Sequence, residues 1–123
     1  MIDFEKEKSE YRHFLYDNRQ TMTELSESEG DGFVEFRKGM EMKKEGRDKE
    51  ALLYFYAAII KKYDNPGLYE ETARLLQRHQ LIEEELNVLE KGIQVIRKGT
   101  FYYQKMVSNI EALREKLREE NGE

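Results

Sequence analysis

The chain has 123 residues, no cysteine and a formal net charge of −5, with 38% hydrophobic and 38% charged residues. The lack of cysteine excludes disulfide bonds, thiolate nucleophiles and cysteine-ligated metals, and the acidic balance argues against nucleic acid as a partner. No apolar run approaches the roughly 20 residues that cross a bilayer, and residues 1–5 do not resemble a secretory signal, so we expect a cytoplasmic protein without a membrane partner.

Residues 1–25 are expected to form an amphipathic helix. Apolar and aromatic side chains such as Tyr11, Leu15 and Met22 recur there at helical spacing between charged residues. The next segment, residues 26–32, reads Ser-Glu-Ser-Glu-Gly-Asp-Gly and contains no apolar residue. Its composition predicts an acidic linker.

Five more helices are expected beyond this linker, separated by short breaks at glycine or proline. They cover about residues 33–44, a run from an Asp48 cap to Ile60, residues 68–79, residues 82–96, and residues 101–119 after a Thr100 cap. The run that ends at Ile60 is apolar nearly all round and is expected to be the most buried. No stretch alternates with a period of two residues, so the predicted fold class is all-α. Residues 120–123 are expected to fray.

The helices after the linker repeat. A shift of 34 residues places Phe55 on Leu89 and Ala58 on Gly92, so a large and a small residue recur in the same order. A helix–turn–helix of this length and order resembles the tetratricopeptide repeat. The resemblance covers about residues 33–119 as two and a half degenerate repeats. It is carried by Gly39, Gly46, Ala51, Phe55, Ala58 and Ile59 in the first repeat, and by Ala73, Leu76, Leu86, Leu89, Gly92 and Ile93 in the second.

Four residues depart from the pattern of that family. Glu35 and Lys38 stand where the family usually has large apolar residues. Glu85 replaces an alanine, and Gln80 replaces the glycine of the turn. A plain helical bundle, in which the 34-residue period is a coincidence, therefore stays open as the alternative.

No set of residues points to catalysis. The only histidines are His13 and His79, and His79 with Glu83 supplies too few ligands for a metal site. Gly30-Asp31-Gly32 fits no phosphate-binding loop, and no nucleophile has a matching base. We therefore expect no enzyme activity, no cofactor and no metal.

The resemblance implies a protein-interaction module, either a small adaptor or a regulatory subunit, that holds a peptide or helix of a protein partner in a concave groove. The groove positions carried over by spacing are Phe33, Phe36, Arg37, Met40, Lys44, Arg74, Gln77, Arg78, Lys105 and Asn109. Because guanidinium groups favour carboxylates, we expect an acidic partner. For Phe36 and Met40, packing in the core is the alternative interpretation.

Self-assembly is the competing function. The N-terminal helix, with its acidic residues and its aromatic residues Phe4, Tyr11 and Phe14, could fold onto its own groove or exchange into a second copy as a homodimer. It could equally be an ordinary packing helix. Leu113 and Leu117 of the last helix, beside Tyr102, could supply a second seam for a structural homo-oligomer.

Overall fold

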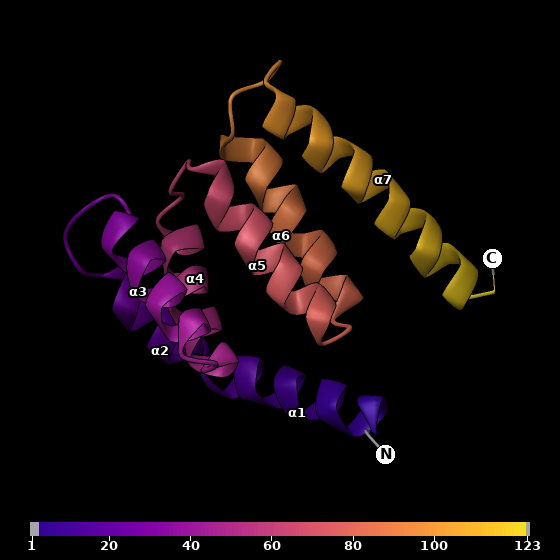
Figure 1. Ribbon diagram of the computed structural model, residues 1–123, viewed down its shortest axis with the longest axis horizontal. Helices are drawn as coiled ribbons and strands as arrows, with labels where there is room; N and C mark the ends of the chain where they lie inside the picture. The colour runs from indigo at the N-terminus through magenta and orange to yellow at the C-terminus, as the bar shows by residue number, and fades with distance from the viewer. Residues whose placement is uncertain (1–2, 123) are drawn as a thin grey trace. The chain divides into compact units, whose positions relative to one another are not determined.

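The computed structural model describes residues 3–122, and in that range it contains seven α-helices and no strand (Figure 1). The helices are α1 (Phe4–Asp17), α2 (Arg19–Ser26), α3 (Phe33–Lys44), α4 (Asp48–Ile60), α5 (Pro66–Arg78), α6 (Ile82–Val95) and α7 (Phe101–Glu120). The all-α prediction is therefore confirmed. The chain divides into two compact units, unit 1 ending at Tyr63 and unit 2 beginning at Asp64. None of the described helices combines the length and the apolar character that crossing a membrane requires.

The N-terminal helix is interrupted, so the prediction of one helix over residues 1–25 was wrong. α1 ends and α2 begins on either side of Asn18, whose side-chain amide donates a hydrogen bond of 2.8 Å to the carbonyl oxygen of Phe14. Asparagine competes in this way with the helical backbone. Both helices pack on α4, burying Tyr11, Leu15 and Met22. The N-terminal segment is thus a packing element of unit 1. Residues 1 and 2 lie outside the described residues.

α3 and α4 form a tightly packed hairpin in unit 1. A β-carbon at Gly39 would lie 2.5 Å from the ring of Phe55, a side chain with no exposed surface. The ring of Phe36 lies 6.0 Å, centroid to centroid, from that of Phe55 and also from that of Tyr63. Phe36 is half-buried and packs on the core side of α3. Asp48 is the first residue of α4 rather than its cap, since the N-cap is Arg47.

A buried ion pair holds the acidic segment between α2 and α3. Lys61 Nζ lies 2.9 Å from Glu35 Oε1 and 2.9 Å from Ser28 Oγ, and it also donates to the carbonyl oxygens of Glu29 and Gly30 at 3.2 and 3.4 Å. The Glu35 and Lys61 side chains are only 6% and 7% exposed. Burial acts to raise the pKa of Glu35, but hydrogen bonds from Ser28 and Lys61, with the Lys61 charge, outweigh it and leave the pKa below its usual value. Residues 26–32, expected to be a linker, are therefore fastened to the end of α4.

Local sequence explains the three helices of unit 2. Asn65 caps α5 by accepting a hydrogen bond of 2.8 Å from the Gly67 amide, and Pro66 occupies the first helical position. Thr100 caps α7 by accepting from the Tyr103 amide at 3.2 Å, as expected. α6 packs closely against α5 and α7 at Gly92, where a β-carbon would lie 3.0 Å from both Tyr69 and Met106. α7 ends at Glu120, and of the tail expected over residues 120–123 the last residue lies outside the described range.

The turn between α5 and α6 contains a strained residue. Gln80, which stands at the expected turn glycine, has a φ of 59°. A left-handed conformation costs a non-glycine residue about 1–2 kcal/mol. Glycine relieves that cost but loses more entropy on folding, so Gln80→Gly is expected to raise the free energy of unfolding by about 1 kcal/mol, measured by urea denaturation. As the control, Lys91→Gly in the exposed face of α6 should lower it by about 0.7 kcal/mol. A loss of stability in Gln80→Gly would contradict the left-handed turn.

Candidate binding pocket

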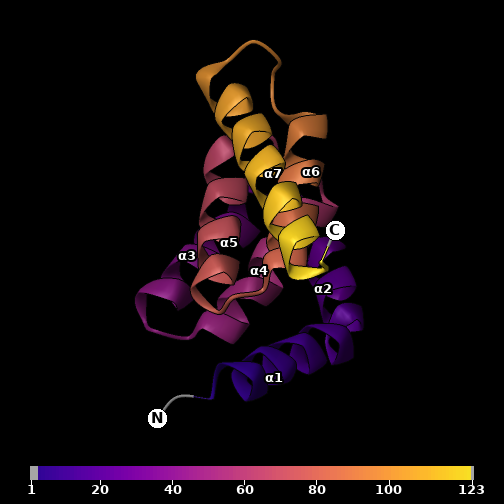
Figure 2. The ribbon, with the colours of Figure 1, turned by 90° about the vertical axis from the view of Figure 1, so that its right-hand side faces the viewer.

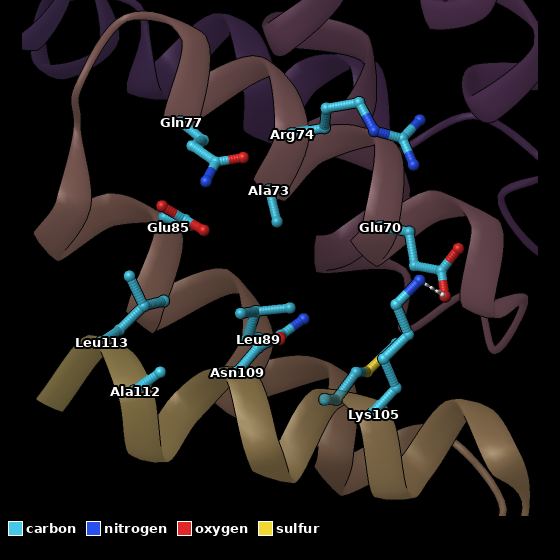
Figure 3. Close-up of a pocket in the computed structure, with 11 residues that line it drawn as sticks. Glu70, Ala73, Arg74, Gln77, Glu85, Leu89, Lys105, Asn109, Ala112 and Leu113 are labelled. Carbon is cyan, nitrogen blue, oxygen red and sulfur yellow. Dashed lines mark ion pairs between the residues drawn. The ribbon is translucent and has the colours of Figure 1, made fainter.

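Unit 2 contains a pocket of about 340 Å³ between α5, α6 and α7 (Figure 3). Its lining mixes polar and apolar side chains from all three helices. The lining residues are Glu70, Ala73, Arg74 and Gln77 from α5, Glu85 and Leu89 from α6, and Lys105, Met106, Asn109, Ala112 and Leu113 from α7. Figure 2 shows α7 crossing in front of α5 and α6, so the third helix closes one side of the pocket.

The crossing at Gly92 explains why the pocket lies where it does. α6 meets Tyr69 and Met106 closely at Gly92 because that position lacks a side chain. Toward the C-terminal end of α7 the distance between α7 and α6 grows (Figure 1). Leu113, which lies in that part of α7, is only half-buried. The pocket occupies the space that opens on this side of the crossing.

Glu85 is the least expected residue in the pocket. Its side chain enters from α6, and in the view of Figure 3 the carboxylate lies between Gln77 of α5 and Leu113 of α7. The residue is 7% exposed, and its Oε1 atom has no hydrogen-bond partner among the described residues. Burial raises the pKa of Glu85 to about 7, against a smaller lowering effect of the Lys116 charge. Near neutral pH this carboxyl group is therefore poised between its two charge states.

The two basic residues of the pocket already have carboxylate neighbours. Arg74 Nη1 lies 2.8 Å from Glu71 Oε1. Lys105 Nζ lies 3.9 Å from Glu70 Oε1, a pair drawn as the dashed line in Figure 3. In that view the Arg74 guanidinium points away from Glu85. The pocket is consequently not the basic groove that the count of its arginines and lysines suggests.

Four of the ten groove positions named from sequence come together in this pocket: Arg74, Gln77, Lys105 and Asn109. Arg78 is not among the lining residues. The remaining positions, Phe33, Phe36, Arg37, Met40 and Lys44, belong to α3 in unit 1. There Phe33 is 50% exposed, Met40 is half-buried, and Arg37 lines a second cavity of about 400 Å³ with Leu25 and Tyr54.

Sequence reasoning did not bring Glu85 and Leu113 into one site with the groove positions of α5 and α7. Glu85 departs from the family pattern, in which alanine is expected. A charged residue at a position that packs between helices is the signal that could have found it, because such a residue needs either a partner or a cavity.

The described part of the chain contains no candidate metal site. Among residues 3–122 no group of three or more His, Asp or Glu side chains is placed so that it could hold a metal ion. Comparison of the chain with protein-family models, with curated proteins and with solved structures gave no match. The geometry of the pocket therefore carries the functional argument.

The buried Glu85 carboxyl predicts an unusual dependence of stability on pH. Its pKa is about 7 in the folded chain and near 4.5 when exposed. As the pH rises from 4.5 to 7 the unfolded chain loses this proton while the folded chain keeps it, so the contribution of Glu85 to stability falls and then levels off. Glu85→Gln removes this titration, and at pH 8 it is expected to be more stable than the wild type by about 2 kcal/mol.

The measurement is urea denaturation at pH 4 and at pH 8. At pH 4 the variant should show no gain in stability, because both states of the wild type are then largely protonated at Glu85. Glu83→Gln, at an exposed position of the same helix, is the matched control and should keep the wild-type dependence. Equal pH profiles for Glu85→Gln and the wild type would show that Glu85 is solvated.

Proposed function

We propose that this protein is a non-catalytic interaction module, a cytoplasmic adaptor or regulatory subunit, that binds a segment of a partner protein in the pocket of unit 2. The observation that carries the proposal is the pocket itself. It combines apolar side chains with polar groups from three helices, which is the usual composition of a binding site. A helix or extended peptide could place one side chain in it and continue along α5 and α7.

The packing of the two helical hairpins supports a tetratricopeptide-like repeat as the framework. In the α3–α4 hairpin, Gly39 allows close approach to Phe55. In unit 2, Gly92 of α6 allows close approach to Tyr69 of α5. Each hairpin thus places a glycine against a large aromatic side chain, which lets its two helices approach closely. The proposed framework would present the first helix of each hairpin to a partner.

The test is to block the pocket and compare partner capture by the full chain. Ala112 is an exposed residue that lines the pocket, so Ala112→Trp should fill the entrance without disturbing the core. Its neighbour Glu111 is exposed and does not line the pocket, so Glu111→Trp is the matched control. A partner that is cross-linked by the wild type and Glu111→Trp, but lost with Ala112→Trp, supports the proposal. Retention by both variants would exclude the pocket as the binding site.

Two arginines give an independent comparison. Arg74 lines the pocket and Arg78, one turn later on α5, does not. If the partner lies along the pocket, Arg74→Glu should change its recovery more than Arg78→Glu does. Equal effects would indicate a general response to charge.

Self-association is the second candidate, favoured by exposed aromatic side chains at the start of α7. Phe101 is 73% exposed and Tyr102 47% exposed, and their rings meet edge to face with centroids 5.9 Å apart. An exposed aromatic pair of this kind suits a seam between copies. Light scattering coupled to size exclusion should then show a concentration-dependent oligomer that Tyr102→Asp dissociates. A monomer at all concentrations would exclude this candidate.

A further inference from the structure

Some charged side chains of the pocket in unit 2 have ion-pair or hydrogen-bond partners, and others do not. Arg74 lies beside Glu71 of its own helix, and Lys105 of α7 lies beside Glu70 of α5. Among the described residues, no basic side chain lies within ion-pair distance of Glu85, and its Oε1 atom is buried without a hydrogen bond. Glu70 Oε1 is also buried without a hydrogen bond, and its ion pair with Lys105 is long, at 3.9 Å. The groups of the pocket that lack a hydrogen bond are therefore carboxylate oxygens, which accept hydrogen bonds and can carry negative charge.

A buried carboxylate oxygen without a donor is costly, and a ligand that brings a donor removes that cost. We infer that the pocket binds an arginine or lysine side chain of the partner segment, with the Glu85 carboxylate as its counter-ion. This inference rests on the proposed function and reverses the acidic partner expected from sequence. The methylene groups of such a side chain would lie along Leu89 and Leu113, and its charged head would reach Glu85.

The raised pKa of Glu85 adds a regulatory consequence. A bound cation stabilises the ionised carboxylate, so binding releases a proton from Glu85 and strengthens as the pH rises through about 7. The other charged groups that line the pocket are Glu70 and Arg74 from α5 and Lys105 from α7, and the charge of Lys116, also from α7, acts on Glu85. No histidine lines the pocket, so Glu85 is the group expected to control binding near neutral pH.

Three small probes of similar length separate the possible ligand chemistries: n-butylguanidinium, pentanoate and 1-pentanol. Each is titrated into the full chain while backbone amide shifts are followed by NMR. We expect n-butylguanidinium to shift the amides of Glu85, Leu89 and Leu113 with a millimolar Kd, the affinity that so small a ligand can reach. The Kd should be about tenfold weaker at pH 6 than at pH 8, because a carboxyl group with a pKa of about 7 is then mostly protonated.

Variants decide whether Glu85 is the anchor. Glu85→Gln should weaken n-butylguanidinium binding by tenfold or more at pH 8, and Glu83→Gln, exposed on the same helix, should leave it unchanged. Binding that survives Glu85→Gln, or pentanoate or 1-pentanol binding as tightly as the cation, overturns the inference and leaves the proposed function standing. If none of the three probes shifts these amides, the pocket binds no side chain, and the proposed function fails with the inference.

Discussion

Replacing Lys61 by methionine is expected to lower the free energy of unfolding by about 4 kcal/mol at pH 7. The substitution keeps most of the side-chain volume and removes the charge that faces Glu35. Glu35 is then left as a buried carboxylate whose partner is gone, and the carbonyl oxygens of Glu29 and Gly30 lose the same donor. Urea denaturation measures the loss. Lys38→Met, at an exposed position of α3, is the control and should change stability by less than about 0.5 kcal/mol.

The double variant Glu35→Met with Lys61→Met tests whether the loss in the single variant comes from leaving Glu35 unpaired. Exchange of a whole buried ion pair for apolar side chains is often neutral or stabilising, so the double variant should recover most of what the single variant loses. The pH dependence gives a second check. Because the pKa of Glu35 is lowered from 4.5 in the folded chain, the contribution of the pair is complete above that value and is lost as the pH falls below it. The difference in the free energy of unfolding between the wild type and Lys61→Met should therefore shrink in acid. A difference that stays constant with pH would contradict the ion pair.

Gly39→Val is expected to lower the free energy of unfolding by about 3 kcal/mol. A β-carbon at this position would lie 2.5 Å from two ring atoms of Phe55 and 3.2 Å from the carbonyl oxygen of Ala51. Phe55 has no exposed surface, so its ring cannot move outward, and the two helices would have to separate. Helix propensity alone favours valine over glycine by a few tenths of a kcal/mol, so the sign of the measured change distinguishes the two effects.

Chemical denaturation of Gly39→Val beside two other variants completes the test. Lys38→Val places the same side chain on the exposed face of α3 and should be nearly neutral. Phe55→Leu replaces the ring by a smaller aliphatic side chain, so in that background Gly39→Val should cost less than it does alone. Strict additivity of the two substitutions would indicate that Gly39 and Phe55 do not meet.

Most helix boundaries could be predicted because they depend on local chemistry. The Thr100 cap marks the start of α7, and the apolar run that ends at Ile60 fills α4, as expected. Pro66, expected only as a break before a helix over residues 68–79, is itself the first residue of α5, because its fixed φ suits the first helical position. The break at Asn18 was missed because its spacing fits an uninterrupted amphipathic helix. What interrupts it is a hydrogen bond from the asparagine side chain to Phe14, which a hydrophobic pattern does not contain.

The candidate site was predicted only in part, for a physical reason. Spacing on a helix shows which residues share a face, so Arg74 and Gln77, like Lys105 and Asn109, could be grouped in advance. It does not show which charges are neutralised nearby. The groove was expected to be basic, but Glu70 and Glu71 lie beside Lys105 and Arg74 and offset their charges. Burial of Glu85 is likewise a property of three helices together and is absent from any one of them.

Lys61 also affects how easily a protease can cleave the acidic segment of residues 26–32. By composition, residues 26–32 would be the first place to expect cleavage, since polar loops rich in serine and glycine are common nicking sites. A protease must draw several residues into an extended strand, and here the carbonyl oxygens of Glu29 and Gly30 are bound by the Lys61 ammonium group. Cleavage there therefore requires these hydrogen bonds to open first, which makes the rate of nicking in this segment a report on how often Lys61 releases it.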